Sequence, residues 1–273
     1  MLSVLSRLML LTQYGFEVTP HQHCQNLPIV IDFVKFTLIY GGKMTKEKIY
    51  IENIPAIVWG EKSSKAYIFV HGKLSKKEDA EDFAAIAEGK GYQTISFDLP
   101  EHGERSQKDY KCDIFNGIAD LTKIGDYVFE KWERVSLFGC SLGVYFSLNA
   151  YRDKHFENCL FQSPIVNMEY LIDQMFVWFN ITEEQLRIQR EIQTPVDTMT
   201  WLYYTYVKEH PIDKWTVPTH ILYGAKDNLQ SYGVMKDFAD KFNGNLTVSE
   251  NSEHPFMEES DKTIVKTWMD KSI

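Results

Sequence analysis

Three residues in the second half of the chain have the types and spacing that nucleophilic chemistry requires. Ser141 lies in the pentapeptide GCSLG (139–143), between a buried apolar run and a helical one. A sharp strand-to-helix turn holds a seryl oxygen above a sheet, and glycines at its two ends let the backbones approach closely. The pattern therefore predicts a nucleophile at Ser141; an ordinary tight turn is the alternative.

A serine is a weak nucleophile until a base takes its proton, and an imidazole needs a carboxylate to orient it. His254 lies in a loop (NSEHPF, 251–256) between the last predicted strand and the last predicted helix. Asp227 follows the end of a predicted strand by four residues, in YGAKDN (223–228). We expect His254 to be the base and Asp227 its acid. Asp173 and Asp213 occur in the same chain order and remain alternatives for the acid.

The elements that must position these residues alternate between strand and helix. Short apolar runs predict strands, and apolar residues at helical spacing predict helices. The predicted strands are 48–59 (one or two strands), 66–70, 92–97, 135–138, 158–162, 219–223 and 246–249, and the predicted helices are 78–90, 114–132, 142–151, 232–242 and 259–269. This alternation predicts an α/β fold with a mostly parallel central sheet covered by helices on both faces.

A segment at about 165–215 breaks this rhythm. It is rich in aromatic residues, its pattern is helical, and Pro195 and Pro211 interrupt it. We predict a helical lid insertion; extra packing helices are the alternative. The aromatic side chains that we expect to line an apolar substrate pocket are Phe176, Trp178, Phe179, Trp201 and Tyr204.

Composition excludes several classes of function. The chain has 273 residues and a formal net charge of −9, and an acidic chain is a poor nucleic-acid binder because phosphate contacts need a basic surface. The four cysteines (24, 112, 140 and 159) form no C-x-x-C pair, so they are expected to be free thiols of a cytoplasmic protein. No metal or nucleotide motif occurs. We therefore expect no cofactor and no metal, and the nucleophilic serine predicted above leads us to expect a small-molecule substrate; no oligomeric state is indicated.

The first 43 residues differ from the rest of the chain. Their apolar runs are ten residues long (2–11) or interrupted by charges (29–40), so neither predicts a membrane span. The sequence GGKM (41–44) can be encoded as a ribosome-binding site followed by a start codon. Our hypothesis is that residues 1–43 are an N-terminal extension outside the native protein and that the domain is 44–273. A genuine N-terminal extension is the alternative.

Four motifs from about residue 54 to 270 resemble the α/β-hydrolase superfamily of serine hydrolases, its esterase- and lipase-like members in particular. They are His71-Gly72 after the third predicted strand, DLPEHGERS (98–106) after the fourth, GCSLG (139–143), and the settings of Asp227 and His254. The order serine, aspartate, histidine is also that of the superfamily.

The resemblance implies roles for further residues. The oxyanion donors would be the backbone N–H groups of Leu142 and Lys73, with Leu74 as the alternative to Lys73, because the loop after His71-Gly72 departs from the glycine-rich or aromatic pattern. His102 would be structural. The implied activity is cleavage of a carboxylic ester or thioester of a small or medium acyl group through an acyl-enzyme. A peptidase or amidase with the same triad, and a non-catalytic small-ligand-binding member of the fold, are the alternatives.

Overall fold

An eight-stranded sheet forms the centre of the computed structural model, which describes residues 44–107, 109–254 and 256–273. The predicted extension at residues 1–43 lies outside the described residues. The strands are β1 (Lys46–Ile51), β2 (Ile54–Trp59), β3 (Lys65–Val70), β4 (Gln93–Phe97), β5 (Arg134–Cys140), β6 (Cys159–Gln162), β9 (Thr219–Gly224) and β10 (Asn245–Ser249). They are ordered β1-β2-β4-β3-β5-β6-β9-β10.

The sheet is mostly parallel, as predicted. From β4 to β10, every neighbouring pair of strands is parallel. β2 pairs antiparallel with both β1 and β4, so within this sheet it alone runs against the others. The predicted run 48–59 is therefore a hairpin of two strands.

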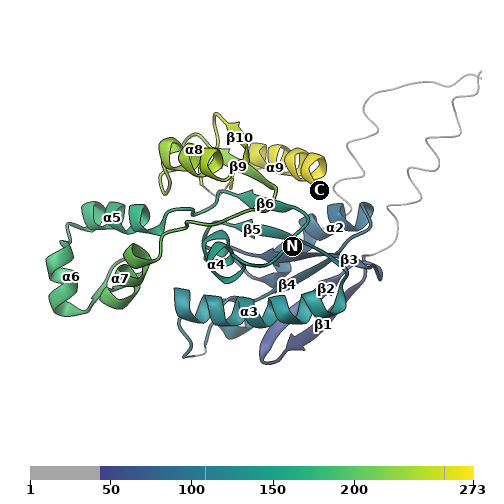
Figure 1. The fold of residues 1–273 in the computed structure, drawn as a ribbon, viewed down its shortest axis with the longest axis horizontal. Helices are drawn as coiled ribbons and strands as arrows, with labels where there is room; N and C mark the ends of the chain where they lie inside the picture. Colours follow the sequence, from purple (N-terminus) through teal and green to yellow (C-terminus); the bar gives the residue numbers. More distant parts are fainter. Residues whose placement is uncertain (1–43, 108, 255) are drawn as a thin grey trace, which may run out of the picture. The chain divides into compact units, whose positions relative to one another are not determined.

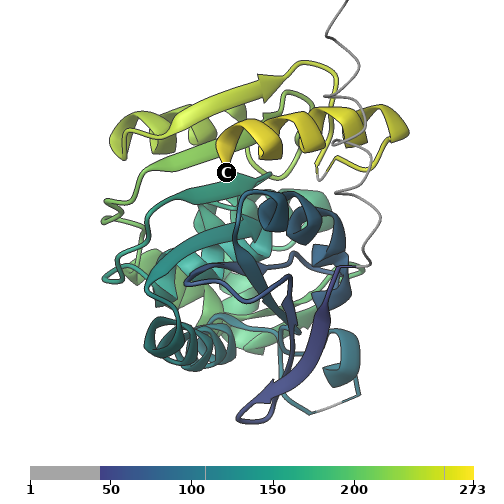
Figure 2. The ribbon, with the colours of Figure 1, turned by 90° about the vertical axis from the view of Figure 1, so that its right-hand side faces the viewer.

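Helices cover both faces of the sheet (Figures 1 and 2). They are α2 (Glu81–Gly89), α3 (Ile114–Lys131), α4 (Leu142–Ala150), α8 (Tyr232–Lys241) and α9 (Glu259–Ser272). Successive side chains of a strand point to opposite faces. In β3, Ala66, Ile68 and Val70 belong to the apolar cluster shared with α3, α4 and α8. Tyr67 and Phe69 belong to the cluster shared with α2 and α9. The near-continuous apolar run of β3 follows from this burial on both faces.

The chain between β6 and β9 forms an inserted segment (Figure 1). It contains α5 (Met168–Phe179), α6 (Glu183–Gln189) and α7 (Trp201–Glu209). A small antiparallel hairpin, β7 (Glu191–Gln193) and β8 (Thr198–Thr200), joins α6 to α7. The helical character matches the sequence pattern, whereas the hairpin was not predicted because each strand has only three residues. We call residues 165–215 the insert.

The parallel strands bring several loops to one edge of the sheet. Val70 at the end of β3 pairs with Gly139 in β5, and Cys140 at the end of β5 pairs with Gln162 in β6. Gly224 at the end of β9 pairs with Ser249 at the end of β10. The loops that carry His71, Ser141, Asp227 and His254 therefore all leave the sheet at its carboxyl edge, where ligands bind in open α/β sheets.

None of the helices in the described residues is long and apolar enough to cross a bilayer.

Candidate active site

Ser141 occupies a strained turn between β5 and α4. Its φ of 50° and ψ of −118° lie where residues other than glycine are rarely found. Close approaches require glycine on both sides of this turn. A Cβ on Gly143 would lie 2.4 Å from the carbonyl oxygen of His71, and one on Gly139 would lie 2.8 Å from a methyl group of Val144. Gly139 thus lets β5 pack closely on α4, and Gly143 lets the start of α4 approach the backbone at the end of β3, so both glycines fit their predicted role. The seryl side chain is held at the carboxyl edge by this backbone.

The structure brings together the three residues predicted from the sequence. The Ser141 Oγ lies 2.8 Å from the His254 Nε2, and the His254 Nδ1 lies 2.8 Å from the Asp227 Oδ2. A carboxylate only accepts, so the proton of a neutral His254 is on Nδ1. The Nε2 lone pair then faces the seryl hydroxyl, which donates to it. This arrangement can remove a proton from Ser141.

Asp227 is fixed from both sides. Its Oδ1 accepts hydrogen bonds from the backbone N–H groups of Leu229 (2.7 Å) and Gln230 (3.1 Å), while Oδ2 faces His254. The two alternatives for the acid are engaged elsewhere. Asp173 accepts a hydrogen bond from the Tyr204 hydroxyl, and Asp213 pairs with Arg152 at the surface. The geometry therefore favours Asp227 as the partner of His254.

Gly224 explains how the loops of Asp227 and His254 come so close. Its φ is not positive, so a sharp left-handed turn is not the reason for glycine here. A Cβ at this position would lie 2.5 Å from the carbonyl oxygen of Ser252. Glycine is needed because the end of β9 touches the loop that carries His254.

The loop after β3 carries the predicted oxyanion donor. The His71 Nδ1 lies 2.7 Å from the Gly72 carbonyl oxygen, and its Nε2 accepts a hydrogen bond from the Leu99 N–H at 3.1 Å. Burial lowers the pKa of His71 to about 4, so this imidazole is neutral at pH 7 and can make both bonds. The Leu74 N–H donates to the His102 Nε2 at 3.0 Å. Because this N–H is engaged, Lys73 is the better candidate for the second donor.

The Lys73 and Leu142 N–H groups have no hydrogen-bond partner within the residues that the structure describes. The Lys73 side chain reaches the insert instead. Its Nζ pairs with the Asp197 carboxylate and donates to the Val196 carbonyl oxygen at 3.0 Å, at the tip of the β7–β8 hairpin. This exposed ion pair is weak in energy, but it joins the loop after β3 to the insert.

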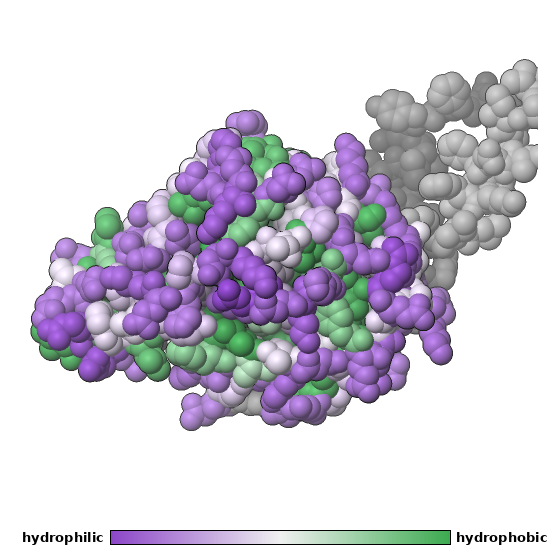
Figure 3. Space-filling model, in the orientation of Figure 1, coloured by the Kyte–Doolittle hydropathy of each residue, from purple (hydrophilic) through white to green (hydrophobic). Residues whose placement is uncertain are grey.

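The predicted pocket residues all lie on the insert. Phe176 and Trp201 both pack against Tyr204, with ring centroids 5.1 and 5.9 Å apart. Phe179 is half-buried, and Trp178 is 44% exposed. On the face shown in Figure 3, hydrophilic residues cover most of α5, α6 and α7, with a few apolar residues among them. Which of the five contact a substrate stays a prediction.

Two buried polar groups near the site were not found from the sequence. The Gln230 Oε1 accepts hydrogen bonds from the Val166 and Asn167 N–H groups, so it ties the start of the insert to the loop of Asp227. Ser252, two residues before His254, donates to the buried Asp261 of α9 at 2.6 Å. A lone Gln or Ser carries no sequence signal, because only the fold shows which of them is buried.

No protein-family model matches the chain, and no curated protein sequence matches it. Solved structures do resemble it. The esterase Est1E from Butyrivibrio proteoclasticus with ferulic acid bound matches with a TM-score of 0.67 at 15% identity, covering 82% of this chain and 96% of that one. The α/β hydrolase domain-containing protein 10 from mouse matches with a TM-score of 0.65 at 18% identity, covering 84% and 98%.

A third similar structure is the Pyrococcus furiosus esterase Pf2001, with a TM-score of 0.56, 16% identity, and 95% of this chain and 99% of that one covered. At these identities the likeness concerns the fold. The described part of the chain therefore has the α/β-hydrolase fold, with a helical insert after β6.

Proposed function

We propose that the chain is a serine hydrolase that cleaves a carboxylic ester or thioester of a small or medium acyl group. One observation carries the proposal: two hydrogen bonds of 2.8 Å link Ser141 to His254 and His254 to Asp227. A serine activated by a base, with that base oriented by a buried carboxylate, is the arrangement that acyl transfer needs. Esterases and hydrolases among the similar structures support the same reading.

The proposed reaction has two halves. Ser141 Oγ attacks the carbonyl carbon while His254 takes its proton, and the imidazolium then gives that proton to the leaving alcohol or thiol. The acyl group stays on Ser141 as an ester. Water then attacks this ester with His254 again as the base, which releases the acid and restores Ser141. The Leu142 and Lys73 N–H groups would stabilise the negative oxygen of each tetrahedral intermediate.

The insert is proposed as the lid of this site. It is anchored on both sides of Ser141: Gln230 holds its first residues beside the Asp227 loop, and its hairpin tip contacts Lys73. The Ile165 N–H also donates to the Ser141 carbonyl oxygen at 3.2 Å. These contacts support an insert that bounds the substrate space.

We also propose a cytoplasmic location. Cys112, Cys140 and Cys159 are free thiols, and thiols are kept reduced in the cytosol.

A substrate panel tests the proposal. We would assay p-nitrophenyl esters from acetate to decanoate, acyl-CoA thioesters, methyl ferulate and aminoacyl amides with the wild-type chain and with Ser141→Ala. Ferulate is included because Est1E was solved with ferulic acid. We expect ester or thioester hydrolysis that the Ser141→Ala variant loses. Turnover that survives in that variant, or turnover of amides alone, would refute the proposal.

A further inference from the structure

His102 lies beside the candidate active site without touching Ser141, His254 or Asp227. It is 8% exposed and belongs to the loop 98–105 after β4. Its Nδ1 lies 2.7 Å from the Pro100 carbonyl oxygen, and its Nε2 accepts the Leu74 N–H at 3.0 Å. A carbonyl only accepts and an amide N–H only donates. Both contacts therefore require a neutral imidazole with its proton on Nδ1.

The bond from Leu74 constrains the proposed oxyanion donor. A trans peptide group is planar, so its C=O and N–H point in opposite directions. The peptide group between Gly72 and Lys73 is held by the contact of His71 with the Gly72 carbonyl oxygen. The peptide group between Lys73 and Leu74 is held by the hydrogen bond from the Leu74 N–H to His102. With both groups held, the backbone at Lys73 cannot turn, and the direction of its N–H is fixed.

The backbone at Leu74 would not stay in place by itself. Leu74 has a φ of 65° and a side chain that is 94% exposed, so no packing supports this unfavourable conformation. The hydrogen bond to His102 is the one interaction of Leu74 in the described residues that opposes its relaxation. Loss of the bond would let the loop after β3 relax and carry the Lys73 N–H with it.

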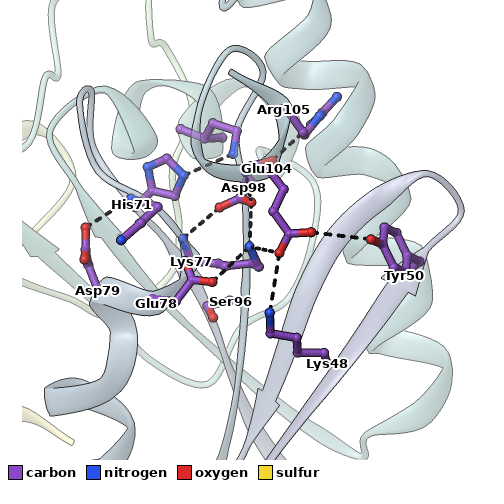
Figure 4. A network of polar contacts seen from close by, with 12 residues as sticks. Lys48, Tyr50, His71, Lys77, Glu78, Asp79, Ser96, Asp98, Glu104 and Arg105 are labelled. Carbon is purple, nitrogen blue, oxygen red and sulfur yellow. Dashed lines mark hydrogen bonds and ion pairs between the residues drawn. The ribbon is translucent and has the colours of Figure 1, made fainter. Parts of the chain in front are cut away.

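The loop 98–105 is held by a network of polar contacts around Asp98 (Figure 4). Asp98 is fully buried and accepts hydrogen bonds from the Lys77 Nζ (2.8 Å), the Lys77 N–H (2.9 Å) and the Glu104 N–H (2.9 Å). Arg105 joins the Asp98 carbonyl oxygen to Asp120 of α3. Gly103 has a φ of 50° and no room for a Cβ, which would lie 2.2 Å from Asp98. His102 therefore projects from a fixed support.

We propose that His102 is a positioning residue that holds the loop after β3 so that the Lys73 N–H points into the oxyanion hole. The proposal rests on the proposed function, because the donor acts only in acyl transfer. A donor of this kind contributes mainly in the transition state, so its displacement lowers kcat and leaves KM nearly unchanged.

Two substitutions separate the two bonds of His102. His102→Gln places an amide oxygen near the position of Nε2, so it keeps an acceptor for Leu74 and loses the donor to Pro100. His102→Asn places its amide near Nδ1, so it keeps a group beside Pro100 and loses the acceptor. The exposed His155→Asn serves as the matched control. The measurements are kcat and KM with a soluble ester, the melting temperature, and hydrogen exchange of the Leu74 amide by NMR.

We expect His102→Asn to lower kcat by about 10- to 100-fold, less than the ~10²- to 10³-fold cost of removing a donor outright. KM should change less than about threefold, and the Leu74 amide should exchange faster. His102→Gln should recover most of the lost kcat and the slow exchange. If His102→Asn equals wild type while His102→Gln is impaired, the bond to Pro100 is the important one and the proposal is wrong.

Two further outcomes would overturn the proposal. Fast exchange of the Leu74 amide in the wild-type chain would show that the bond to His102 does not hold the loop. Equal losses in both variants, in proportion to their melting temperatures, would show a purely structural role. Failure of the proposed function is distinguishable, because the wild-type chain would then show no ester or thioester hydrolysis that depends on Ser141, whereas failure of the His102 proposal leaves that turnover intact.

Discussion

Asp227→Asn isolates the part of the site that orients His254. The Asn amide can lie in two ways. With its oxygen toward Leu229 and Gln230, it keeps the two hydrogen bonds of 2.7 and 3.1 Å, and its NH₂ then faces the His254 Nδ1. Two donors cannot bond, so the imidazole moves its proton to Nε2 and can no longer accept the proton of Ser141.

The opposite orientation is also unfavourable. An Asn oxygen turned to His254 places the NH₂ group against two backbone N–H donors, which leaves buried donors without acceptors at about 1–3 kcal/mol each. The first orientation is therefore preferred, and the protein stays folded with the wrong imidazole tautomer. A triad that loses its carboxylate in this way loses on the order of 10⁴ in kcat, equivalent to about 5 kcal/mol. We expect a loss of at least about 10²-fold.

The assay compares kcat and the melting temperature of Asp227→Asn with those of Asp173→Asn and Asp213→Asn. Both controls should stay near wild type, because Asp173 makes a long bond to a tyrosine hydroxyl (3.3 Å) and Asp213 pairs at the surface. Retained activity in Asp227→Asn together with a large loss in either control would refute the assignment of the acid.

The buried contacts of the domain lead to further expectations. Gly143→Ala should unfold at a clearly lower temperature, because its Cβ would lie within 2.6 Å of two backbone carbonyl oxygens; an unchanged melting temperature would contradict the tight turn. Lys77→Met leaves the buried Asp98 without its cation and should lower the unfolding free energy by about 3–5 kcal/mol in urea titrations. The exposed Lys262→Met should change the unfolding free energy by less than about 1 kcal/mol. Equal losses in the Lys77→Met and Lys262→Met variants would show that the pair of Lys77 with Asp98 does not stabilise the fold. A chain of residues 44–273 should match the full-length chain in melting temperature and ester hydrolysis; a large loss of either would show that residues 1–43 pack on the domain.

The fold could be predicted from the sequence because local patterns specify it. Burial on both faces makes β3 and β5 continuous apolar runs, and the amphipathic spacing of α3 marks one surface of contact. The turn at Ser141 could be predicted because the close packing around it requires glycine at 139 and 143, and these two glycines are visible in the sequence. The hairpin β7–β8 was not, since three residues per strand are too few for a periodicity to appear.

The candidate site shows the limits of sequence more sharply. The chain order alone did not separate Asp173, Asp213 and Asp227 as acids. The place of Asp227 just after a predicted strand favoured it, and its distance of 2.8 Å from His254 supports the same choice. In the same way the sequence left Lys73 and Leu74 as alternative donors, and the bond from the Leu74 N–H to His102 favours Lys73. The structural support for both choices comes from contacts between residues that are distant in the chain, which no local pattern encodes.

Trapping the acyl group on Ser141 would test directly whether Ser141 forms an acyl-enzyme. The wild-type chain would be mixed with a p-nitrophenyl ester, quenched in acid within milliseconds, and measured by intact-protein and peptide mass spectrometry. We expect a mass increase of one acyl group on the peptide that contains Ser141, absent in Ser141→Ala and strongly reduced in His254→Ala. An acyl group on another residue, or steady turnover by Ser141→Ala, would show that Ser141 is not the nucleophile.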